Sequence, residues 1–386
     1  LKEKVDKNLW YAFKGEMLMS LPEPGASAST AKAKSLSTEE MEAMAKKLRR
    51  HIITMTGKAG SGHPGGSLSA VEIVTTLYFK LLRHKPQDPQ WPDRDRFVLS
   101  KGHAAPLLYA ALAECGYLPI DELITLRQLD SRLQGHTDRV ATPGVEMSAG
   151  ALGQGLSFAI GVALAGRLNS QDYRVYVLLG DGECDEGQIW EAAMAAAHFK
   201  LDNLVAIVDN NGQQIDGWNR DVMNLDPFNK KWQAFGWHVI EVDGHDLAQL
   251  TGAFNQAKLV KGQPTVIIAH TIKGKGVSFM ENNVDFHGKA PTAAVVELGR
   301  ENSDIVVLDA DLSRSTMTYF FAREFPNRFF DCGIAEQNMV GIAAGLAVSG
   351  KLAFASTFAV FAPGRCFDQI RMSIAQPGLN VKLVTT

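Results

Sequence analysis

Short apolar runs rich in β-branched residues alternate with longer segments of helical periodicity along most of the chain. A first set of runs covers 174–179, 204–209, 238–242 and 265–269, and a second set covers 305–309, 352–356 and 381–386. Apolar runs of about four to eight residues between helical segments are typical of parallel strands buried on both faces. The pattern therefore predicts an α/β fold in which parallel sheets are flanked by helices.

The chain before the first helix has a different composition. Residues 21–37 are rich in Pro, Ala, Ser and Lys and can bury little apolar surface, so we predict a tail or linker over 1–37. A helix is predicted to begin after Ser37 or Thr38, because a hydroxyl there can accept a hydrogen bond from the first turn. It is expected to run to about Thr56.

The strand runs divide the rest of the chain into two successive α/β units. We place the first at 38–280, a polar connection at 281–294 and the second at 295–386, with helical patterns around 335–349 and 366–375. The second unit ends on a strand that no helix follows. A sheet in that state leaves an apolar face uncovered, so we expect the sequence to be incomplete at its C-terminus.

Composition excludes several classes of protein. The chain has 386 residues, is 46% hydrophobic and 21% charged, and carries a net charge of -3, which gives no reason to expect nucleic acid as a partner. Its longest apolar runs fall far short of the ~20 residues that cross a bilayer, and no secretion signal is visible. The four cysteines lack the spacing of a disulfide framework or zinc site. We therefore predict a cytoplasmic protein without a membrane span.

A glycine-rich acidic motif and an asparagine pair follow two neighbouring strand runs. Gly-Asp-Gly occupies 180–182, and Asn-Asn occupies 210–211. The carboxyl ends of parallel strands meet at one sheet edge, where glycines permit close approach of a phosphate. Alone, Gly-Asp-Gly is most often a solvated turn. With the intervening helix and strand, however, the pair resembles the signature of enzymes that use thiamine diphosphate.

This resemblance assigns a metal site and part of a cofactor site. The carboxylate of Asp181, the side chain of Asn211 and the backbone carbonyl of Gln213 would bind Mg²⁺ or Ca²⁺, since hard oxygen ligands suit both ions. Gly182, Glu183 and Asn211 would also contact thiamine diphosphate.

Four histidines lie in loops that also contain glycine. They are His63 in GKAGSGHPGG, His103 in LSKGHAAP, His136 in LQGHTDRV and His287 in VDFHGKAP. A single histidine is more often a surface or core residue, but four in such loops favour a site that moves protons near neutral pH. Together with Gly-Asp-Gly and Asn-Asn, and in the same order, these segments resemble transketolase over about residues 40–386.

The transketolase resemblance implies a thiamine-diphosphate-binding fold with a diphosphate domain followed by a pyrimidine domain. The four histidines would be catalytic proton shuttles around the thiazolium ring and the sugar. Of these, His103 and His287 would also contact the cofactor, and His63 and His287 the substrate. The backbone of Gly150, Ala151 and Leu152 would meet the cofactor, which the side chains of Leu152 and Ile215 would hold bent.

The second unit supplies the remaining residues of the resemblance. In CGIAEQNM, Glu336 would be the catalytic glutamate that shares a proton with the pyrimidine ring, although by itself a glutamate there is often only a helix-end charge. Phe358 and Phe361 would stack on that ring, the alternative being ordinary core aromatics. Ser315 would contact the substrate phosphate.

The implied activity is transfer of a two-carbon ketol unit from a ketose phosphate to an aldose phosphate. Because the family's site lies between chains, the resemblance also implies a homodimer, or a heterotetramer with a complementary C-terminal chain.

The sequence departs from the family's pattern in two places that concern substrate binding. The connection at 281–294 is shorter than in relatives and lacks an arginine for the substrate phosphate, and the family's third, C-terminal domain is absent.

Three alternatives stay open. Deoxyxylulose-phosphate synthase and dihydroxyacetone synthase share the segment from Gly-Asp-Gly to Asn-Asn, although FDQIRM and AEQNM favour transketolase. The third alternative is a catalytically inactive partner subunit that binds cofactor without turnover.

Overall fold

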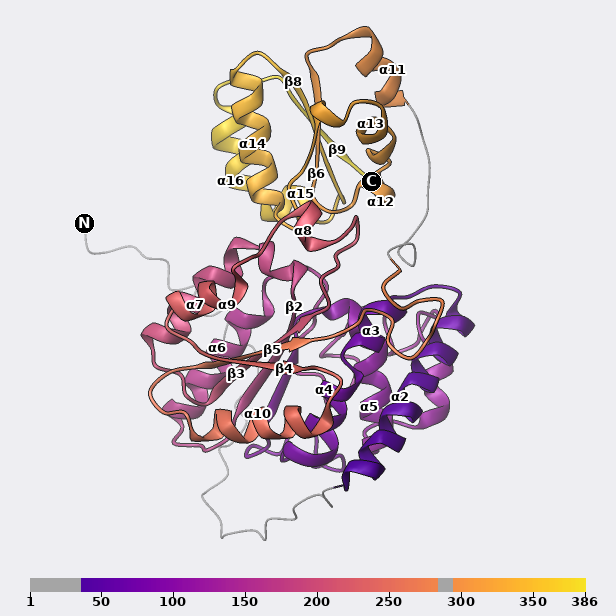
Figure 1. Ribbon diagram of the computed structural model, residues 1–386, viewed down its shortest axis with the longest axis vertical. Helices are drawn as coiled ribbons and strands as arrows, with labels where there is room; N and C mark the ends of the chain where they lie inside the picture. The colour runs from indigo at the N-terminus through magenta and orange to yellow at the C-terminus, as the bar shows by residue number, and fades with distance from the viewer. Residues whose placement is uncertain (1–35, 284–293) are drawn as a thin grey trace, which may run out of the picture. The chain divides into compact units, whose positions relative to one another are not determined.

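The computed structural model describes residues 36–283 and 294–386, which form two parallel β-sheets with helices on both faces (Figure 1). The α/β fold expected from the sequence is confirmed. The predicted tail up to residue 35 and most of the predicted connection lie outside the described residues. The strands are β1 (Arg96–Leu99), β2 (Val175–Gly180), β3 (Leu204–Asn210), β4 (His238–Asp243), β5 (Thr265–His270), β6 (Ile305–Asp309), β7 (Phe329–Asp331), β8 (Leu352–Thr357) and β9 (Val381–Thr385).

The first sheet has the strand order β1-β2-β3-β5-β4, and every neighbouring pair is parallel. All five carboxyl ends therefore lie at one edge. The register pairs Gly180 with Asp209 and Asn210 with His270. The two motifs that follow β2 and β3 are consequently neighbours at this edge, as the sequence predicts.

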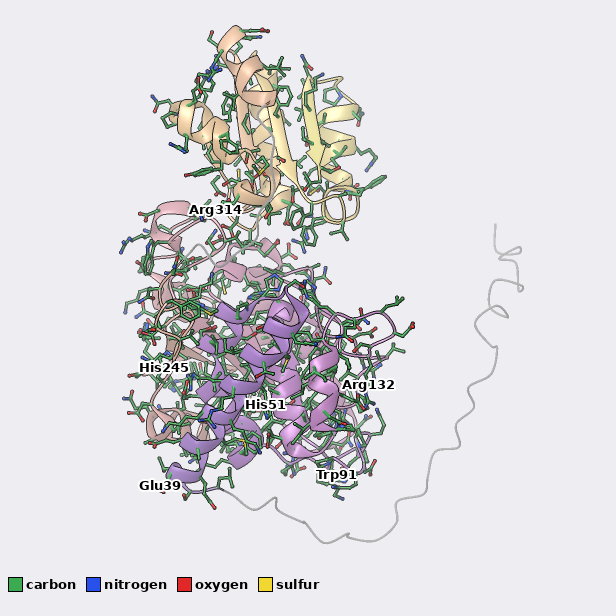
Figure 2. The ribbon with its side chains drawn as sticks, turned by 90° about the vertical axis from the view of Figure 1, so that its right-hand side faces the viewer. Glu39, His51, Trp91, Arg132, His245 and Arg314 are labelled. Carbon is green, nitrogen blue, oxygen red and sulfur yellow. The ribbon has the colours of Figure 1, made fainter. Side chains whose placement is uncertain are left out.

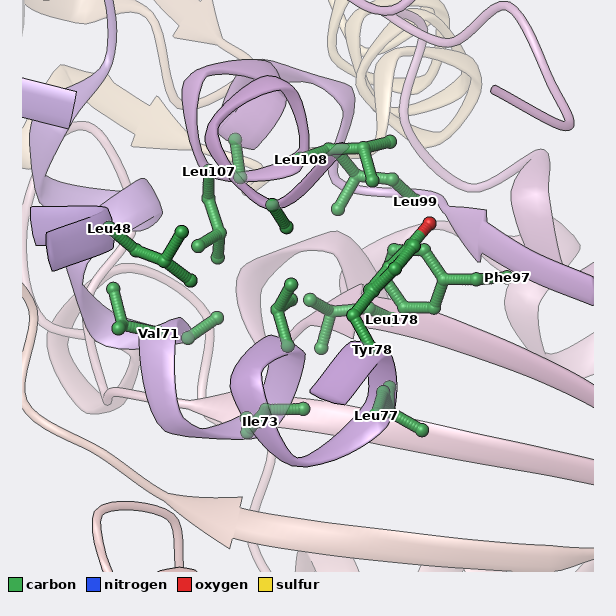
Figure 3. Packing of buried hydrophobic residues seen from close by; sticks show 14 of the residues in the cluster. Leu48, Val71, Ile73, Leu77, Tyr78, Phe97, Leu99, Leu107, Leu108 and Leu178 are labelled. Atoms are coloured by element: carbon green, nitrogen blue, oxygen red, sulfur yellow. The ribbon is translucent and has the colours of Figure 1, made fainter. Parts of the chain in front are cut away.

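Helices cover both faces of the first sheet because its strands bury residues on both sides. One face packs against α2 (Thr38–Ala59), α4 (Val71–Thr76), α5 (Ala105–Cys115) and α10 (Leu247–Leu259), and the other against α6 (Gly155–Leu168), α7 (Gly187–His198) and α9 (Phe228–Ala234). Figure 3 shows the first of these cores, in which Leu178 of β2 and Phe97 of β1 meet Leu107 of α5 and Leu48 of α2. Alternate strand residues such as Val177 point to the opposite core.

Helix α2 begins where the hydroxyl pattern predicts. The Ser37 side chain accepts the Glu40 N–H, and the Glu40 carboxylate accepts the Ser37 N–H, which forms a capping box. Glu39 adds a negative charge to the first turn (Figure 2). The helix ends three residues later than predicted, because the left-handed conformation that stops it is supplied by Gly60, with φ 64°.

The second sheet has the order β7-β6-β8-β9 and is also parallel throughout. Helix α14 (Glu336–Val348) covers one face, whereas α11 (Ala294–Glu301) and α13 (Tyr319–Glu324) cover the other (Figure 1). Strand β6 alternates accordingly: Leu308 packs against Met339 of α14, and Val307 packs with Phe321 of α13.

The remaining elements are short. They are α3 (Pro64–Ser69), α8 (Asn219–Val222), α12 (Ser313–Thr316), α15 (Ala362–Arg365), α16 (Phe367–Gln369), the 3₁₀ turns η2 (Gly102–Ala104), η3 (Ile120–Thr125), η4 (Gly182–Asp185) and η6 (Pro326–Arg328), and the π-helical turns η1 (Leu77–Leu81) and η7 (Ile370–Ala375). Among the described residues, no helix combines the length and apolar character needed to cross a membrane. The four cysteines are free thiols.

Candidate functional site

A cavity of about 350 Å³ gathers most of the predicted site residues, and residues from both sheets line it. Its lining includes His63, His103, His136, Gly150, Leu152, Asp181, Gly182, Glu183, Asn211, Gln213, Ile215, Glu336, Phe358 and Phe361. Of the other predicted residues, Ala151 and Ser315 are not among the lining residues, and His287 lies outside the described part of the chain. Ser315 is half-buried in α12, where its N–H donates to the Leu312 carbonyl.

One part of the cavity carries the oxygen donors that follow β2 and β3. The carboxylate of Asp181 accepts the N–H groups of Gly182 (2.9 Å) and Gly212 (2.6 Å), which fixes its orientation. Burial, and then the nearby Asp209 carboxylate, raise the pKa of Asp181 to about 6. A buried acid of raised pKa binds a cation readily, because the cation's charge offsets the cost of burying the carboxylate.

The amide residues beside Asp181 fit a metal and a diphosphate. The Oδ1 atom of Asn211 accepts the Gln213 N–H at 3.1 Å, which holds this loop in a tight turn. Both polar ends of the Gln213 side chain are buried and have no hydrogen-bond partner among the described residues. Buried amides without partners are costly, so a polar ligand in the cavity would satisfy them. A carboxylate, an amide oxygen and a backbone carbonyl form a donor set that suits Mg²⁺ or Ca²⁺.

Two lysines that sequence reasoning missed also line the cavity. Lys101 is fully buried and forms an ion pair with Asp209. Lys273 donates to the carbonyls of Gln214 (3.2 Å) and Gln213 (3.4 Å), and burial lowers its pKa to about 8. The signal for Lys273 was present, since HTIKGKG is a basic, glycine-rich segment directly after β5, at the same sheet edge. These cations suit an anionic ligand.

A buried polar network holds the segment that carries Lys273. Arg49 binds Glu72 through two hydrogen bonds of 2.7 and 2.8 Å, and Glu72 bonds His245 Nδ1 at 2.9 Å. The Nε2 atom of His245 accepts the Ile272 N–H at 2.9 Å, so Nδ1 carries the proton. Lys273 is thus positioned by residues of α2, α4 and the loop before α10.

Three of the predicted histidines lie together in the cavity. The ring centroid of His63 is 5.6 Å from that of His103 and 5.7 Å from that of His136. A side chain on Gly66 would come within 2.9 Å of His103, which explains why glycine stands there. Burial, followed by repulsion from His136 and neighbouring cations, lowers the pKa of His63 to about 4. Burial likewise lowers the pKa of His136. His63 is therefore neutral near pH 7, with one ring nitrogen that donates and one that accepts a hydrogen bond.

The second sheet contributes a carboxyl group and two aromatic rings. Glu336 is the first residue of α14 and is 2% exposed. The ring centroids of Phe358 and Phe361 lie 6.1 Å apart with their planes 30° apart. A buried carboxyl group near two inclined aromatic rings can hold a flat heterocycle by a hydrogen bond and by ring contacts.

Two further charged residues meet Glu336, and sequence reasoning did not single them out. Arg365 forms ion pairs with both Glu336 and Glu186, and it donates to the Leu152 carbonyl at 3.0 Å. Burial and the Glu336 carboxyl raise the pKa of Glu186 to about 9. Both residues lie close to motifs of the sequence analysis: Glu186 is four residues after Gly-Asp-Gly, and Arg365 is two residues before FDQIRM. Their partners are distant in sequence, which concealed the contact.

Reciprocal carboxylate contacts join the loop after β3 to the second sheet. Asp311 accepts the N–H groups of Ile215 and Asp216 at 2.8 Å each, while Asp216 accepts the N–H of Ser313 and, at 3.3 Å, that of Arg314. Burial and the neighbouring carboxyl groups raise the pKa of Asp311 well above its usual range. The loop that holds Asn211 and Gln213 is thereby fixed by residues after β6.

The same acidic region predicts a dependence of stability on pH. Burial raises the pKa of Asp309 to about 8, above the value of 3.8 for an exposed aspartate. Its protonated form therefore stabilises the fold at low pH, and this contribution is lost between about pH 4 and pH 8. Because asparagine cannot ionise, we expect the Tm difference between Asp309→Asn and wild type to shift in favour of the variant as the pH rises from 5 to 8.5. Exposed Asp304→Asn should show a constant difference over this range, and a constant difference for Asp309→Asn would contradict the raised pKa of Asp309.

Comparison with known proteins agrees with the cavity. The family model described as transketolase, thiamine diphosphate binding domain, matches residues 40–305, and that described as transketolase, pyrimidine binding domain, matches 287–386. Transketolase of Homo sapiens is 41% identical over 402 residues, which cover 87% of this chain and 63% of that protein. Transketolase-like protein 2 of Mus musculus is 38% identical, with 92% and 66% covered. The chain thus spans slightly less than two thirds of the length of these relatives.

One shorter relative and the solved structures complete the comparison. The 6-deoxy-6-sulfo-D-fructose transketolase subunit SqwG of Clostridium sp. (strain MSTE9) is 46% identical over 269 residues, which cover 68% of this chain and 98% of that protein. The crystal structure of transketolase from Campylobacter jejuni matches with a TM-score of 0.64 and 27% identity, covering 90% of this chain and 69% of that one. The cavity, the two domain models and these relatives agree, and the chain belongs to the transketolase family, with a thiamine diphosphate binding domain and a pyrimidine binding domain.

Proposed function

We propose that this chain is a transketolase, which uses thiamine diphosphate to transfer a two-carbon ketol unit from a ketose phosphate to an aldose phosphate. The observation that carries the proposal is the shared cavity. It brings the oxygen donors Asp181 and Asn211 together with Glu336 and with three histidines. Sugar phosphates are supported as substrates by a solved transketolase of Pichia stipitis in complex with sedoheptulose-7-phosphate, 26% identical to this chain with a TM-score of 0.61.

In this proposal the residues at the ends of β2 and β3 hold the metal and the diphosphate. Asp181, the Asn211 side chain and the Gln213 carbonyl bind Mg²⁺ or Ca²⁺. Gly182, Glu183 and His103 line the cavity beside them and contact the diphosphate, while buried Lys273 balances its charge. A diphosphate and a divalent cation retain a net negative charge, which a lysine at this place offsets.

The cofactor's two rings require different surroundings. Glu336 hydrogen-bonds the aminopyrimidine ring, and Phe358 and Phe361 contact its faces. The backbone of Gly150 and Ala151 and the side chains of Leu152 and Ile215 would hold the cofactor between its two rings. When bound, thiamine diphosphate supplies the carbanion centre and the electron sink of the reaction.

The histidines act on the sugar. Because their pKa values are lowered by burial, His63 and His136 are neutral at pH 7 and accept or donate protons at the sugar hydroxyls. We propose that His103 and His287 share this task and that Ser315 contacts the substrate phosphate.

A labelled donor tests the proposed activity. The purified chain, with thiamine diphosphate and Mg²⁺, is incubated with a ketose phosphate labelled at C1 and C2 and with an aldose phosphate, and the products are followed by NMR. Label in the lengthened aldose is the expected result. Two parallel reactions address the alternatives. Transfer of a two-carbon unit from labelled pyruvate to the aldose phosphate, with release of CO2, would instead favour deoxyxylulose-phosphate synthase, and transfer of the label from the ketose phosphate to formaldehyde would favour dihydroxyacetone synthase. Cofactor binding without any transfer would favour an inactive partner subunit.

A second donor deserves the same assay because of the shorter relative. That relative is named for 6-deoxy-6-sulfo-D-fructose and is 46% identical to this chain along 98% of its own length. Fructose 6-phosphate and its sulfonate analogue differ only at C6, so the ratio of kcat/KM for the two donors isolates recognition of the anion. We expect the phosphate to be preferred by about tenfold or more, since a dianion accepts stronger charge-assisted hydrogen bonds than a monoanion.

We propose a homodimer as the assembly, with a complementary C-terminal chain as the alternative partner. Light scattering of the purified chain at micromolar concentration should then give about twice the chain mass of 42.0 kDa. A mass of one chain, together with transfer activity only after a C-terminal transketolase fragment is added, would support the two-chain enzyme instead.

A further inference from the structure

The side chain of Gln213 ends in an amide group for which the described residues offer no partner. The residue is 3% exposed, and its Nε2 and Oε1 atoms are both buried without a hydrogen bond to any residue of 36–283 or 294–386. Its backbone, by contrast, is held, because the N–H donates to Asn211 Oδ1 at 3.1 Å and the carbonyl accepts the Lys273 ammonium at 3.4 Å. Gln213 thus combines a fixed backbone with an unused donor and an unused acceptor.

This arrangement is unfavourable for the protein without a ligand. A buried donor or acceptor that lacks a partner has lost its water and gained no bond in return. Methionine has a side chain of similar length and flexibility, and it would fill the same space without that cost. The glutamine is therefore better explained by a group that enters the cavity, whose lining includes Gln213, than by the stability of the fold.

The surroundings of Gln213 favour an anionic ligand. The residue lies in the loop after β3, two positions after Asn211 of the proposed metal site. Lys101 and Lys273 line the same cavity and are 1% and 6% exposed. Because the Lys273 ammonium contacts the Gln213 carbonyl, a positive charge lies directly beside this residue. Buried cations beside an unpaired amide suit a ligand with several negatively charged oxygens.

The amide also requires a ligand that both accepts and donates hydrogen bonds. Phosphoryl oxygens are strong acceptors, and water molecules on a metal ion donate. Mg²⁺ loses its water reluctantly and usually keeps several waters when it binds a phosphate group. A diphosphate with a hydrated metal ion therefore satisfies both ends of the amide, which neither of them would do alone.

We propose that the side chain of Gln213 is a further cofactor-binding group, whose Nε2 donates to a diphosphate oxygen and whose Oε1 accepts a hydrogen bond from the hydration shell of the metal ion. The inference rests on the proposed cofactor and adds to it the side chain of a residue used so far only through its carbonyl. The terminal torsion of a glutamine is soft, so the amide turns into the cavity while the backbone stays in place. The free protein carries the cost of the buried amide, and the complex does not.

A matched pair of substitutions tests the first part of this inference. Gln213→Met removes both polar atoms and keeps the length of the side chain. The control is Gln249→Met, because Gln249 lies outside the cavity lining and both ends of its amide are bonded, to the Asp243 N–H at 3.1 Å and to the Asp246 carboxylate at 3.0 Å. In thermal unfolding without cofactor, we expect the Tm of Gln213→Met to rise by about 1–4 °C and that of Gln249→Met to fall.

Titration with two ligands tests the second part. Isothermal titration measures the affinity for thiamine diphosphate and, separately, for inorganic pyrophosphate, each with Mg²⁺ present. We expect Gln213→Met to weaken both by about tenfold, since a hydrogen bond to a charged group is lost, and Gln249→Met to stay within about twofold of wild type. Pyrophosphate carries neither the thiamine rings nor a sugar hydroxyl, so a similar loss for both ligands locates the contact at the diphosphate.

The outcomes separate the inference from the proposed function. A Tm of Gln213→Met below that of wild type would overturn the inference, because the amide would then have a partner within the folded chain. Unchanged affinity for pyrophosphate would also overturn it, since the contact would then lie on the thiamine rings or the sugar. A wild-type chain that binds pyrophosphate more tightly than Gln213→Met does, but binds no thiamine diphosphate, would leave Gln213 assigned to the diphosphate group and would refute the proposed cofactor instead.

Discussion

Replacing Asp181 with alanine is expected to weaken the binding of thiamine diphosphate and Mg²⁺ by more than about 100-fold, or about 2.7 kcal/mol. Asp181 supplies the charged ligand of the proposed metal site, and no other carboxylate among the lining residues follows β2 as closely as this one. Without it, the diphosphate loses the cation that neutralises it. Isothermal titration of the purified variant measures the change.

Two further variants make the Asp181 result interpretable. Asp181→Asn preserves the shape of the side chain and can still accept one of the Gly182 and Gly212 N–H groups through its single oxygen, while losing the charged ligand. Asp172→Ala removes an aspartate whose side chain is 84% exposed and should leave binding unchanged. Binding of Asp181→Asn within about threefold of wild type, and still abolished by EDTA, would place the metal elsewhere.

Glu336→Gln is expected to bind cofactor within a few-fold of wild type while kcat for ketol transfer falls by about 100-fold to 10,000-fold. Glutamine fills the same space and can hydrogen-bond a pyrimidine nitrogen, but it cannot exchange the proton, and proton transfer by a placed group contributes about that factor. Label transfer from the donor sugar measures kcat, and isothermal titration measures affinity.

The control for Glu336 is a glutamate with a surface role. Glu324→Gln removes the same charge from an ion pair with Arg300, where the carboxylate is 36% exposed, and should leave kcat unchanged. Equal loss of affinity and kcat in Glu336→Gln would indicate a structural role only. Activity within about threefold of wild type would remove Glu336 from the mechanism.

The sequence predicted the long strands well because their apolar runs are continuous. Predicted strand bounds for 204–209 and 305–309 agree with β3 and β6 to within a residue. Strand β1 was missed because RFVL is only four residues long and follows a polar segment, and β7 was missed because three residues carry no periodicity. The helix predicted at 366–375 exists as α16 and the π-helical turn η7, a distinction that periodicity does not make.

Some residues of the candidate site could be predicted from the sequence, and others could not. Residues such as Asp181 were visible because they lie in local motifs at strand ends, where topology brings them to one edge. Arg365 could not be recognised in the sequence, because its contacts are with Glu186, 179 positions earlier, and with Leu152, 213 positions earlier. Lys273 lies in a basic, glycine-rich segment after β5, but the burial of its side chain could not be read from that segment. Contacts of this range are set by how the elements pack, and no local pattern encodes them.

The contacts made by the carboxylates of Asp216 and Asp311 determine what would happen if this chain were divided between its two sheets. Each sheet holds backbone N–H groups whose acceptor belongs to the other: Ile215 and Asp216 depend on Asp311, and Ser313 and Arg314 depend on Asp216. Within one polypeptide these contacts form at the high effective concentration of tethered partners. If the two sheets were made as separate polypeptides, the metal-binding loop would be ordered only in molecules where the two polypeptides had associated. Cofactor affinity would then increase with the concentration of the polypeptide that carries the second sheet.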